Sequence, residues 1–143
     1  MITIEQLKEL QLRADKLKQY LAIDEKRLQL EEEELRTQDP GFWEDAKAAE
    51  AQMRKVKTIK KWIEGYEGVR AATEELQLAF DYYKEELVTE DEVDNAYNHA
   101  IKEVEDLEMK NMLSHEEDQM PAVLKIVSGA GGTEAKEIGR AQV

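Results

Sequence analysis

The sequence predicts a mainly α-helical protein: an antiparallel bundle of three long helices, followed by one orphan β-strand and a glycine-rich loop. Three observations lead to this prediction. Apolar residues recur at helical spacing through most of the 143 residues. Only 7 glycines and 2 prolines interrupt the backbone. After about residue 118 the pattern changes, because a short β-branched segment and a glycine cluster replace the helical periodicity.

The first predicted helix is a single long one that begins after Thr3 and ends at Asp39-Pro40-Gly41. Thr3, with Gln6 three residues later, has the spacing of a capping box. The proline disfavours helical backbone in the residue before it, and the glycine accepts a positive φ, so the helix stops there.

An apolar seam with a seven-residue repeat runs along this helix. Its members are Leu7, Leu10, Ala14, Leu17, Leu21, Leu28 and Leu35. Asp24 and Glu31 fall where the seam should continue, and Ile23 and Leu30 carry the apolar face instead. A perfect zipper would not shift in this way, so we expect the helix to pack within its own chain, with residues 31–34 as a solvated acidic face.

The second predicted helix covers about residues 44–87. One side of it is apolar, formed by Ala46, Ala49, Met53, Val56, Ile63, Tyr66, Val69, Leu76, Phe80, Tyr83 and Leu87. Gly65 and Gly68 lie inside this helix, and each costs about 1 kcal/mol relative to alanine, so we expect a kink or a break there. Phe42 and Trp43 precede the helix as an entry staple, and we expect Trp43 and Trp62 to cap the core.

The third predicted helix begins after Thr89 and fades near Ser114. Thr89 with Glu92 has the capping-box spacing, and acidic side chains suit a helix N-terminus. The apolar positions of this helix are Val93, Tyr97, Ala100, Val104 and Leu107. Three helices joined by short connections bury such faces most simply as an antiparallel bundle.

The last part of the chain predicts the start of a second domain. Residues 122–127 form a short apolar, β-branched segment typical of a strand, and residues 128–133 form a glycine-rich loop. One strand cannot complete a sheet. We therefore predict a helical domain over residues 1–118 and the beginning of a truncated second domain over residues 119–143.

Composition and motifs argue against several classes of function. No segment approaches the roughly 20 apolar residues that cross a bilayer, and the start of the chain lacks the features of a secretory signal, so we expect a cytoplasmic protein. There are no cysteines. The glycine loop lacks the dinucleotide and P-loop patterns, and His99 with Glu103 supplies too few ligands for a metal. We expect no catalytic residue, no cofactor and no metal, and hence no enzyme.

A cluster of basic residues on the second helix is the strongest candidate for a binding site. Its members share one helical face: Lys47, Arg54, Lys57 and Lys61. In a chain with a net charge of -13, this concentration of cations makes a local positive field able to meet phosphates. The alternative is a solvated face neutralised by Glu50, Glu64 and other acidic neighbours.

The glycine loop also carries a resemblance to a known family. Residues 129–135, Gly-Ala-Gly-Gly-Thr-Glu-Ala, are similar to the segment that opens the codon-reading domain of bacterial peptide chain release factor 2. Further matches follow the same order along the chain: Tyr20-Leu21, then Asp39-Pro40-Gly41-Phe42-Trp43, then the acidic stretch before Ala122. The threonine at position 133 favours factor 2 over factor 1. After Ala135 the resemblance ends, and residues 136–143 depart from the family pattern.

The resemblance implies a cytoplasmic factor for translation termination at stop codons on the ribosome. The family reads the codon with a Ser-Pro-Phe tripeptide and places the hydrolytic water with Gly-Gly-Gln, and neither motif occurs in this sequence. The expected protein is thus an N-terminal portion, truncated before these motifs and not catalytic by itself. The implied partners are ribosomal RNA, proteins at the stalk base and the GTPase release factor, and the four cations become candidate ribosome contacts.

An interpretation of a different class stays open at this point. An acidic helical bundle or coiled coil can serve as an adaptor that engages a protein partner. This alternative explains the heptads and the charge, but it has no explanation for the strand and the glycine loop. A lone apolar strand can also pair with a second copy by edge addition, so a homodimer through residues 122–127 is a further alternative.

Overall fold

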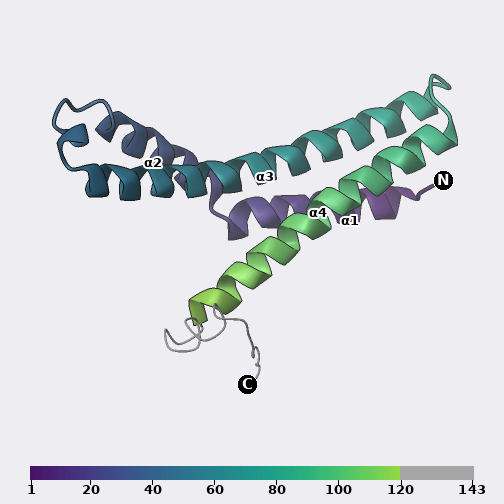
Figure 1. Cartoon of the computed structure of the whole chain (residues 1–143). Helices are drawn as coiled ribbons and strands as arrows, with labels where there is room; N and C mark the ends of the chain where they lie inside the picture. The colour runs from purple at the N-terminus through teal and green to yellow at the C-terminus, as the bar shows by residue number, and fades with distance from the viewer. Residues whose placement is uncertain (120–143) are drawn as a thin grey trace. The chain divides into compact units, whose positions relative to one another are not determined.

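A computed structural model describes residues 1–119, and these are almost entirely helical. The elements are α1 (Ile4–Tyr20), α2 (Ile23–Arg36), the short 3₁₀ helix η1 (Phe42–Glu44), α3 (Ala46–Lys84) and α4 (Glu90–Gln119) (Figure 1). The mainly α-helical class is therefore confirmed for this part of the chain. The predicted strand at residues 122–127 and the glycine loop lie outside the described residues, and the predicted domain boundary at residue 118 stays a prediction.

The expected single helix before Asp39 is in fact two helices, and the sequence interpretation was wrong here. Ala22 lies between α1 and α2 in the left-handed region, with φ 49° and ψ 52°. This conformation costs a non-glycine residue about 1–2 kcal/mol. Burial of the flanking side chains opposes that cost, since Leu21 is 4% exposed and Ile23 is fully buried.

The break at Ala22 also turns the apolar seam away from the core. Leu7, Leu10, Ala14 and Leu17 are buried on α1, as predicted. Leu28 and Leu35, which the same seven-residue repeat placed inside, are 64% and 59% exposed on α2. A left-handed residue changes the direction and rotation of the chain, so the repeat no longer identifies the buried face beyond it.

The core lies within a compact unit, Met1–Glu108, and combines side chains of α1, α3 and α4 with Leu21 and Ile23 at the junction of α1 and α2. Its fully buried larger members are Leu7, Leu10, Leu17, Ile23, Val69, Leu76, Val93 and Val104. Polar contacts join the same helices at the edge of this core. Gln11 of α1 donates to Gln77 of α3 at 2.6 Å, and Arg13 of α1 forms a two-pronged ion pair with Glu108 of α4.

The side-chain caps predicted at Thr3 and Thr89 are both formed, and a third is present at Asp45. Thr3 and Gln6 form the complete capping box at α1. The Thr89 hydroxyl accepts a hydrogen bond from the Glu92 amide at the start of α4. Asp45 caps α3 by accepting from the amides of Lys47 and Ala48. These bonds satisfy amides that have no partner within the helix.

The two glycines inside α3 do not break it, so of the expected kink or break, the break is wrong. α3 is one continuous helix over 39 residues. A Cβ atom at Gly65 would lie 3.1 Å from Leu107 Cδ1, and one at Gly68 would lie 3.0 Å from Glu103 Oε1. Both glycines thus face α4, and their missing side chains let the two helices approach closely.

The connection between α2 and α3 is a tight turn around η1. The Asp39 carboxylate accepts a hydrogen bond from the Gly41 amide at 3.0 Å. Phe42 and Trp43 meet edge to face, with ring centroids 4.7 Å apart. Trp43 is 61% exposed, so its predicted place in the core is wrong, whereas Trp62 packs against the core. No helix among the described residues is long and apolar enough to cross a membrane.

Candidate nucleic-acid interface

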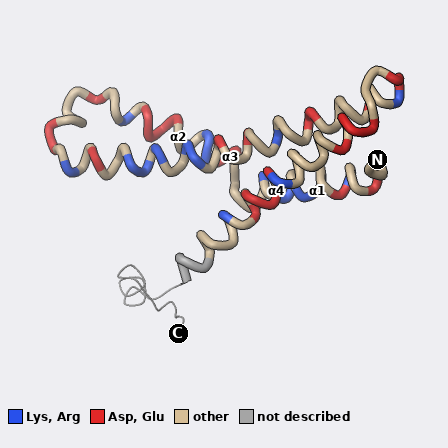
Figure 2. Tube along the Cα trace, turned by 45° about the vertical axis from the view of Figure 1, so that its right-hand side comes forward, with Lys and Arg blue, Asp and Glu red and all other residues tan. Residues whose placement is uncertain are grey.

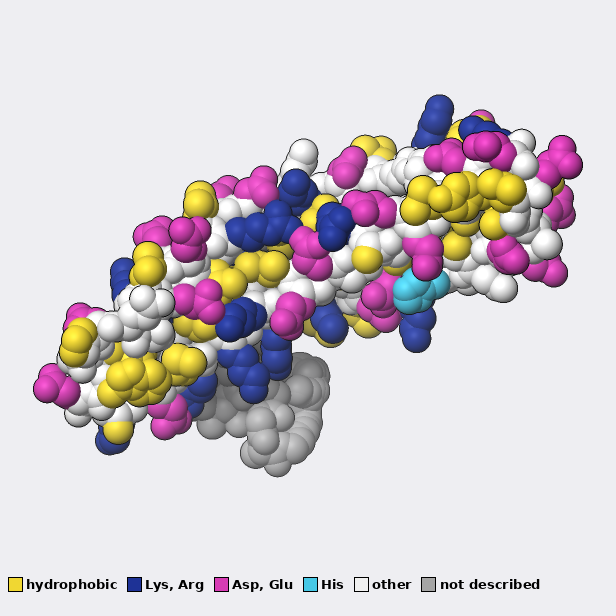
Figure 3. Space-filling view, turned by 90° about the horizontal axis from the view of Figure 1, so that it is seen from above, with side chains coloured by type: hydrophobic (Ala, Val, Ile, Leu, Met, Phe, Trp, Pro, Cys, Tyr) yellow, Lys and Arg dark blue, Asp and Glu magenta, His cyan; other side chains and the backbone are white. Residues whose placement is uncertain are grey.

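Positive charge is concentrated in the first half of α3. Residues 46–63 contain six lysines and arginines against a single glutamate, a net charge of +5 in a chain whose net charge is -13. Figure 2 shows these cations recurring along the part of α3 that runs beside α2. In the space-filling view, Lys and Arg side chains gather in groups, whereas Asp and Glu are spread over the visible surface (Figure 3).

Two of these six cations face α2 and are neutralised by it. Lys55 Nζ lies 3.4 Å from Glu33 Oε2, and Lys60 Nζ lies 3.1 Å from Glu34 Oε2. Glu33 is only 4% exposed, so the predicted solvated face at residues 31–34 is wrong at this position. The Gln52 amide donates to the Glu33 carboxylate, and Arg36 lies 3.5 Å from it. Charge-matched ion pairs and a hydrogen bond therefore join α2 to α3, on a stretch of α3 that also buries Val56 and Ile59.

The other four cations are the predicted cluster, and the structure places all of them at exposed positions of α3. Their spacing of seven, three and four residues keeps them on one face of a helix. We call this set (Lys47, Arg54, Lys57 and Lys61) the basic face. Arg54 forms one ion pair, 3.5 Å from Glu50, and both partners are about 70% exposed. Such a pair contributes little, because water screens it.

Within residues 1–119, no carboxylate forms an ion pair with Lys47, Lys57 or Lys61. Of the two acidic neighbours named in the alternative interpretation, Glu50 forms an ion pair with the basic face within residues 1–119, at Arg54. A lysine ammonium group without an internal ion pair can contact a phosphate oxygen directly, because no existing pair has to be broken first.

The buried carboxylate of Glu33 gives the contact between α2 and α3 a pH dependence. The hydrogen bond from Gln52 lowers the pKa of Glu33 below its ordinary value of 4.5, and Arg36 and Lys55 lower it further. A lowered pKa means that ionised Glu33 stabilises the fold above pH 4.5. This contribution is lost as the pH falls through the lowered pKa.

We therefore expect Glu33→Gln to lower the free energy of unfolding at about pH 7 more than at an acidic pH below the lowered pKa, where the wild-type carboxylate is neutral too. Urea unfolding of both proteins at the two pH values measures the difference. A stability gap that stays constant across this range would contradict the assignment. Glu32→Gln, at an exposed neighbouring position, is the control and should show no such dependence.

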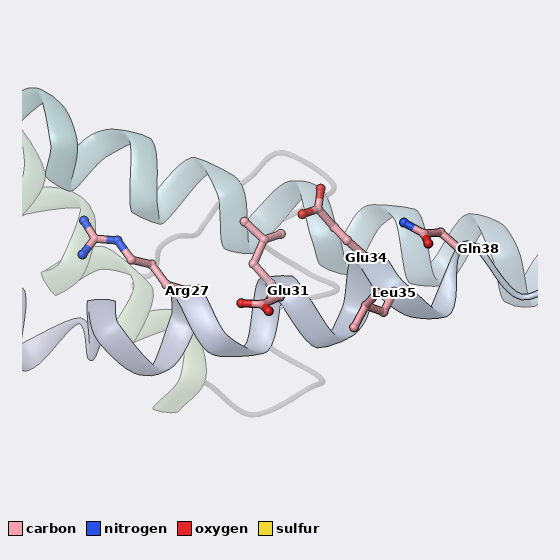
Figure 4. A pocket seen from close by; sticks show the side chains of 6 residues that line it. Arg27, Glu31, Glu34, Leu35 and Gln38 are labelled. Carbon is pink, nitrogen blue, oxygen red and sulfur yellow. The ribbon is translucent and has the colours of Figure 1, made fainter.

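The other candidate residues do not form a site in the described part of the chain. His99 is exposed and Glu103 is half-buried. No group of three metal-ligating side chains occurs within residues 1–119. Open grooves in the described part of the chain include one of about 380 Å³ on α2 (Figure 4) and one of about 430 Å³ between α1 and α3. The second is lined by Tyr66, Arg70 and Glu74 among others.

Sequence reasoning found the basic face but missed the buried acid beside it. Glu33 lies in a run of four glutamates, and such a run normally marks a solvated surface. The sequence did offer one indication that Glu33 is buried, namely the opposite charges of the two neighbouring helices. Six acids occur in α2 and six bases in the first half of α3, so part of each set is expected to meet.

The comparisons with known proteins agree on one family. The profile of the PCRF domain matches residues 23–140. The chain is 33% identical over 133 residues to peptide chain release factor 2 of Acidithiobacillus ferrooxidans, covering 90% of this chain and 36% of the relative. It is 34% identical over 140 residues to peptide chain release factor 2 of Wolinella succinogenes, covering 93% and 37%.

A third relative, peptide chain release factor 2 of Nitratiruptor sp., is 30% identical over 140 residues, again with 93% and 37% coverage. This chain thus spans a little over a third of the length of the curated relatives it matches. No solved structure matches it significantly.

Proposed function

Because the chain belongs to the PCRF domain family, we propose that it forms the N-terminal domain of a release factor 2-like protein and acts in translation termination at stop codons on the ribosome. The match over residues 23–140 and the release factor 2 relatives support this proposal. The domain assists termination without catalysing it, since the sequence contains no Gly-Gly-Gln. It works in the cytoplasm, where translation takes place.

The basic face is the observation that carries the ribosome contact. Its cations are exposed on a continuous helix and concentrated in an otherwise acidic chain. Ribosomal RNA presents dense phosphate charge, and lysine and arginine on one helical face can contact it. Proteins of the stalk base and the GTPase release factor are further proposed partners. The predicted strand and glycine loop after residue 121 fit the opening of a codon-reading domain.

The proposal predicts that reversing charge on the basic face weakens ribosome binding. Arg54→Glu with Lys57→Glu should lower the fraction of the chain that pellets with ribosomes, with a loss of affinity of about tenfold or more, because phosphate contacts are replaced by repulsion. The positions are exposed, so the helical fold should persist. Sedimentation through a sucrose cushion measures binding.

Lys8→Glu with Lys16→Glu is the matched control. It makes the same change of charge at exposed positions of α1. The control should bind like wild type. Equal loss in both variants would mean that net charge alone matters and would contradict the basic face as a contact. A wild-type chain that does not pellet with ribosomes would favour the adaptor interpretation.

A further inference from the structure

α2 presents two exposed leucines on the side that faces away from its polar contact with α3. Leu28 and Leu35 lie seven residues apart, with Glu31 and Glu32 between them. The spacings of three, four and seven residues place these four side chains on one helical face. We call this set (Leu28, Glu31, Glu32 and Leu35) the leucine face. The leucines are 64% and 59% exposed, whereas Ile23 at the start of the helix is fully buried.

A groove of about 380 Å³ lies along the same helix. Figure 4 shows its lining side chains along α2 and just after it, with Arg27 at one end and Gln38 at the other. The half-buried Leu30 and the exposed Leu35 provide its apolar surface, and Glu31 and Glu34 provide its charge. The helical part of this lining, from Arg27 to Leu35, rises about 12 Å, the length of a little over two turns of a partner helix.

The charge of this surface selects the kind of partner. Within residues 1–119, neither Glu31 nor Glu32 forms an ion pair with a lysine or arginine. Asp24, by contrast, pairs with Arg27, and Glu34 pairs with Lys60. Leucines flanked by free carboxylates suit a helix that has leucines on one side and lysines or arginines around them. The net charge of -13 also attracts a basic partner from a distance.

We infer that the leucine face, together with the adjoining groove that shares Glu31 and Leu35 with it, docks a basic amphipathic helix of a partner protein. The leucines supply the apolar contact that holds the complex, and Glu31 and Glu32 fix the orientation through surrounding lysines or arginines. This inference goes beyond the contact with ribosomal RNA. The basic face belongs to α3 and the leucine face to α2, so each can be altered without the other.

A designed peptide tests the docking surface directly. The probe is a fluorescent helical peptide of about 15 residues with leucines at spacings of three and four and lysines elsewhere. A second peptide of the same composition has its leucines scattered around the helix. Fluorescence anisotropy with the full chain, at physiological ionic strength, should show binding of the amphipathic peptide at least about tenfold tighter than the scattered one.

Substitutions on the face then locate the site. Glu31→Lys with Leu35→Ser should weaken binding of the amphipathic peptide about tenfold, and Leu28→Ser with Glu32→Lys should do the same. The matched control is Glu75→Lys with Leu78→Ser, which makes the same changes at exposed positions of α3. The control should bind within about twofold of wild type. Circular dichroism should show unchanged helicity in all three variants.

Three outcomes would overturn the inference. Equal binding of the two peptides would reduce it to nonspecific attraction by the acidic chain. An equal loss in the α2 variants and the α3 control would remove the leucine face as the site. Concentration-dependent self-association in sedimentation velocity, abolished by Glu31→Lys with Leu35→Ser, would assign the face to a second copy of the chain. These three results do not depend on whether the variant Arg54→Glu with Lys57→Glu loses ribosome binding.

Discussion

Leu76→Ala is expected to lower the free energy of unfolding by about 2–5 kcal/mol, the range typical of removing a fully buried leucine side chain. Leu76 lies on α3 and has no exposed surface. It belongs to the core that joins α1, α3 and α4. The alanine variant loses the apolar burial of the leucine and leaves a cavity that the surrounding helices fill only in part.

Urea unfolding, followed by circular dichroism at 222 nm as the usual reporter of helix, measures this loss. Leu78→Ala is the matched control, two residues further along the same helix. Leu78 is 52% exposed, so its replacement should change stability by no more than about 0.5 kcal/mol. Similar effects at the two positions would contradict the assigned inner face of α3.

Gly65→Leu is expected to destabilise the protein by about 1–3 kcal/mol through overpacking. A Cβ atom at this position would already lie 3.1 Å from Leu107 Cδ1, and the rest of a leucine side chain would press further into α4. Leu107 is 4% exposed and has little room to move. The helices must therefore separate or adopt strained side-chain conformations.

Gly68→Ala provides a control of the opposite sign. Its Cβ would lie 3.0 Å from Glu103 Oε1, the end of a flexible and half-buried side chain that can swing away. The variant should gain up to about 1 kcal/mol, because alanine favours helix over glycine. Thermal unfolding of both variants, compared with wild type, measures the two changes in stability. Stabilisation by Gly65→Leu would contradict the close contact between α3 and α4.

Much of the fold could be predicted because its determinants are local. Thr3 and Thr89 have the sequence spacing of helix caps, and both caps are formed. The stop expected at positions 39–41 is only roughly right, because α2 already ends at Arg36. Gly41 has φ -78°, so the positive φ expected there is not adopted. Buried positions of α1, α3 and α4 follow helical periodicity, so most of their core residues were identified in advance.

The break at Ala22 could not be predicted in the same way. Alanine is the best helix former and gives no indication of a left-handed conformation. The break depends on tertiary burial of Leu21 and Ile23. One trace of it is visible in the sequence, since the apolar face shifts by one residue at Ile23. That shift reflects a change of direction that exposes Leu28 and Leu35, the leucines of the proposed docking surface.

The candidate site was predictable only where it depends on spacing within one helix and not on packing between helices. Helical spacing alone groups the four cations of the basic face. The pairing of Lys55 and Lys60 with α2 depends on how two helices lie against each other. The burial of Glu33 depends on the same packing, which local sequence does not encode.

The salt dependence of ribosome binding tests the role of the basic face most directly. Wild type and the variant Arg54→Glu with Lys57→Glu are compared over a series of salt concentrations. If both cations contact phosphates, the slope of log affinity against log salt should be less steep in the variant by roughly 0.7–0.9 for each lost contact. Parallel slopes for the two proteins would show that the basic face does not contact ribosomal RNA.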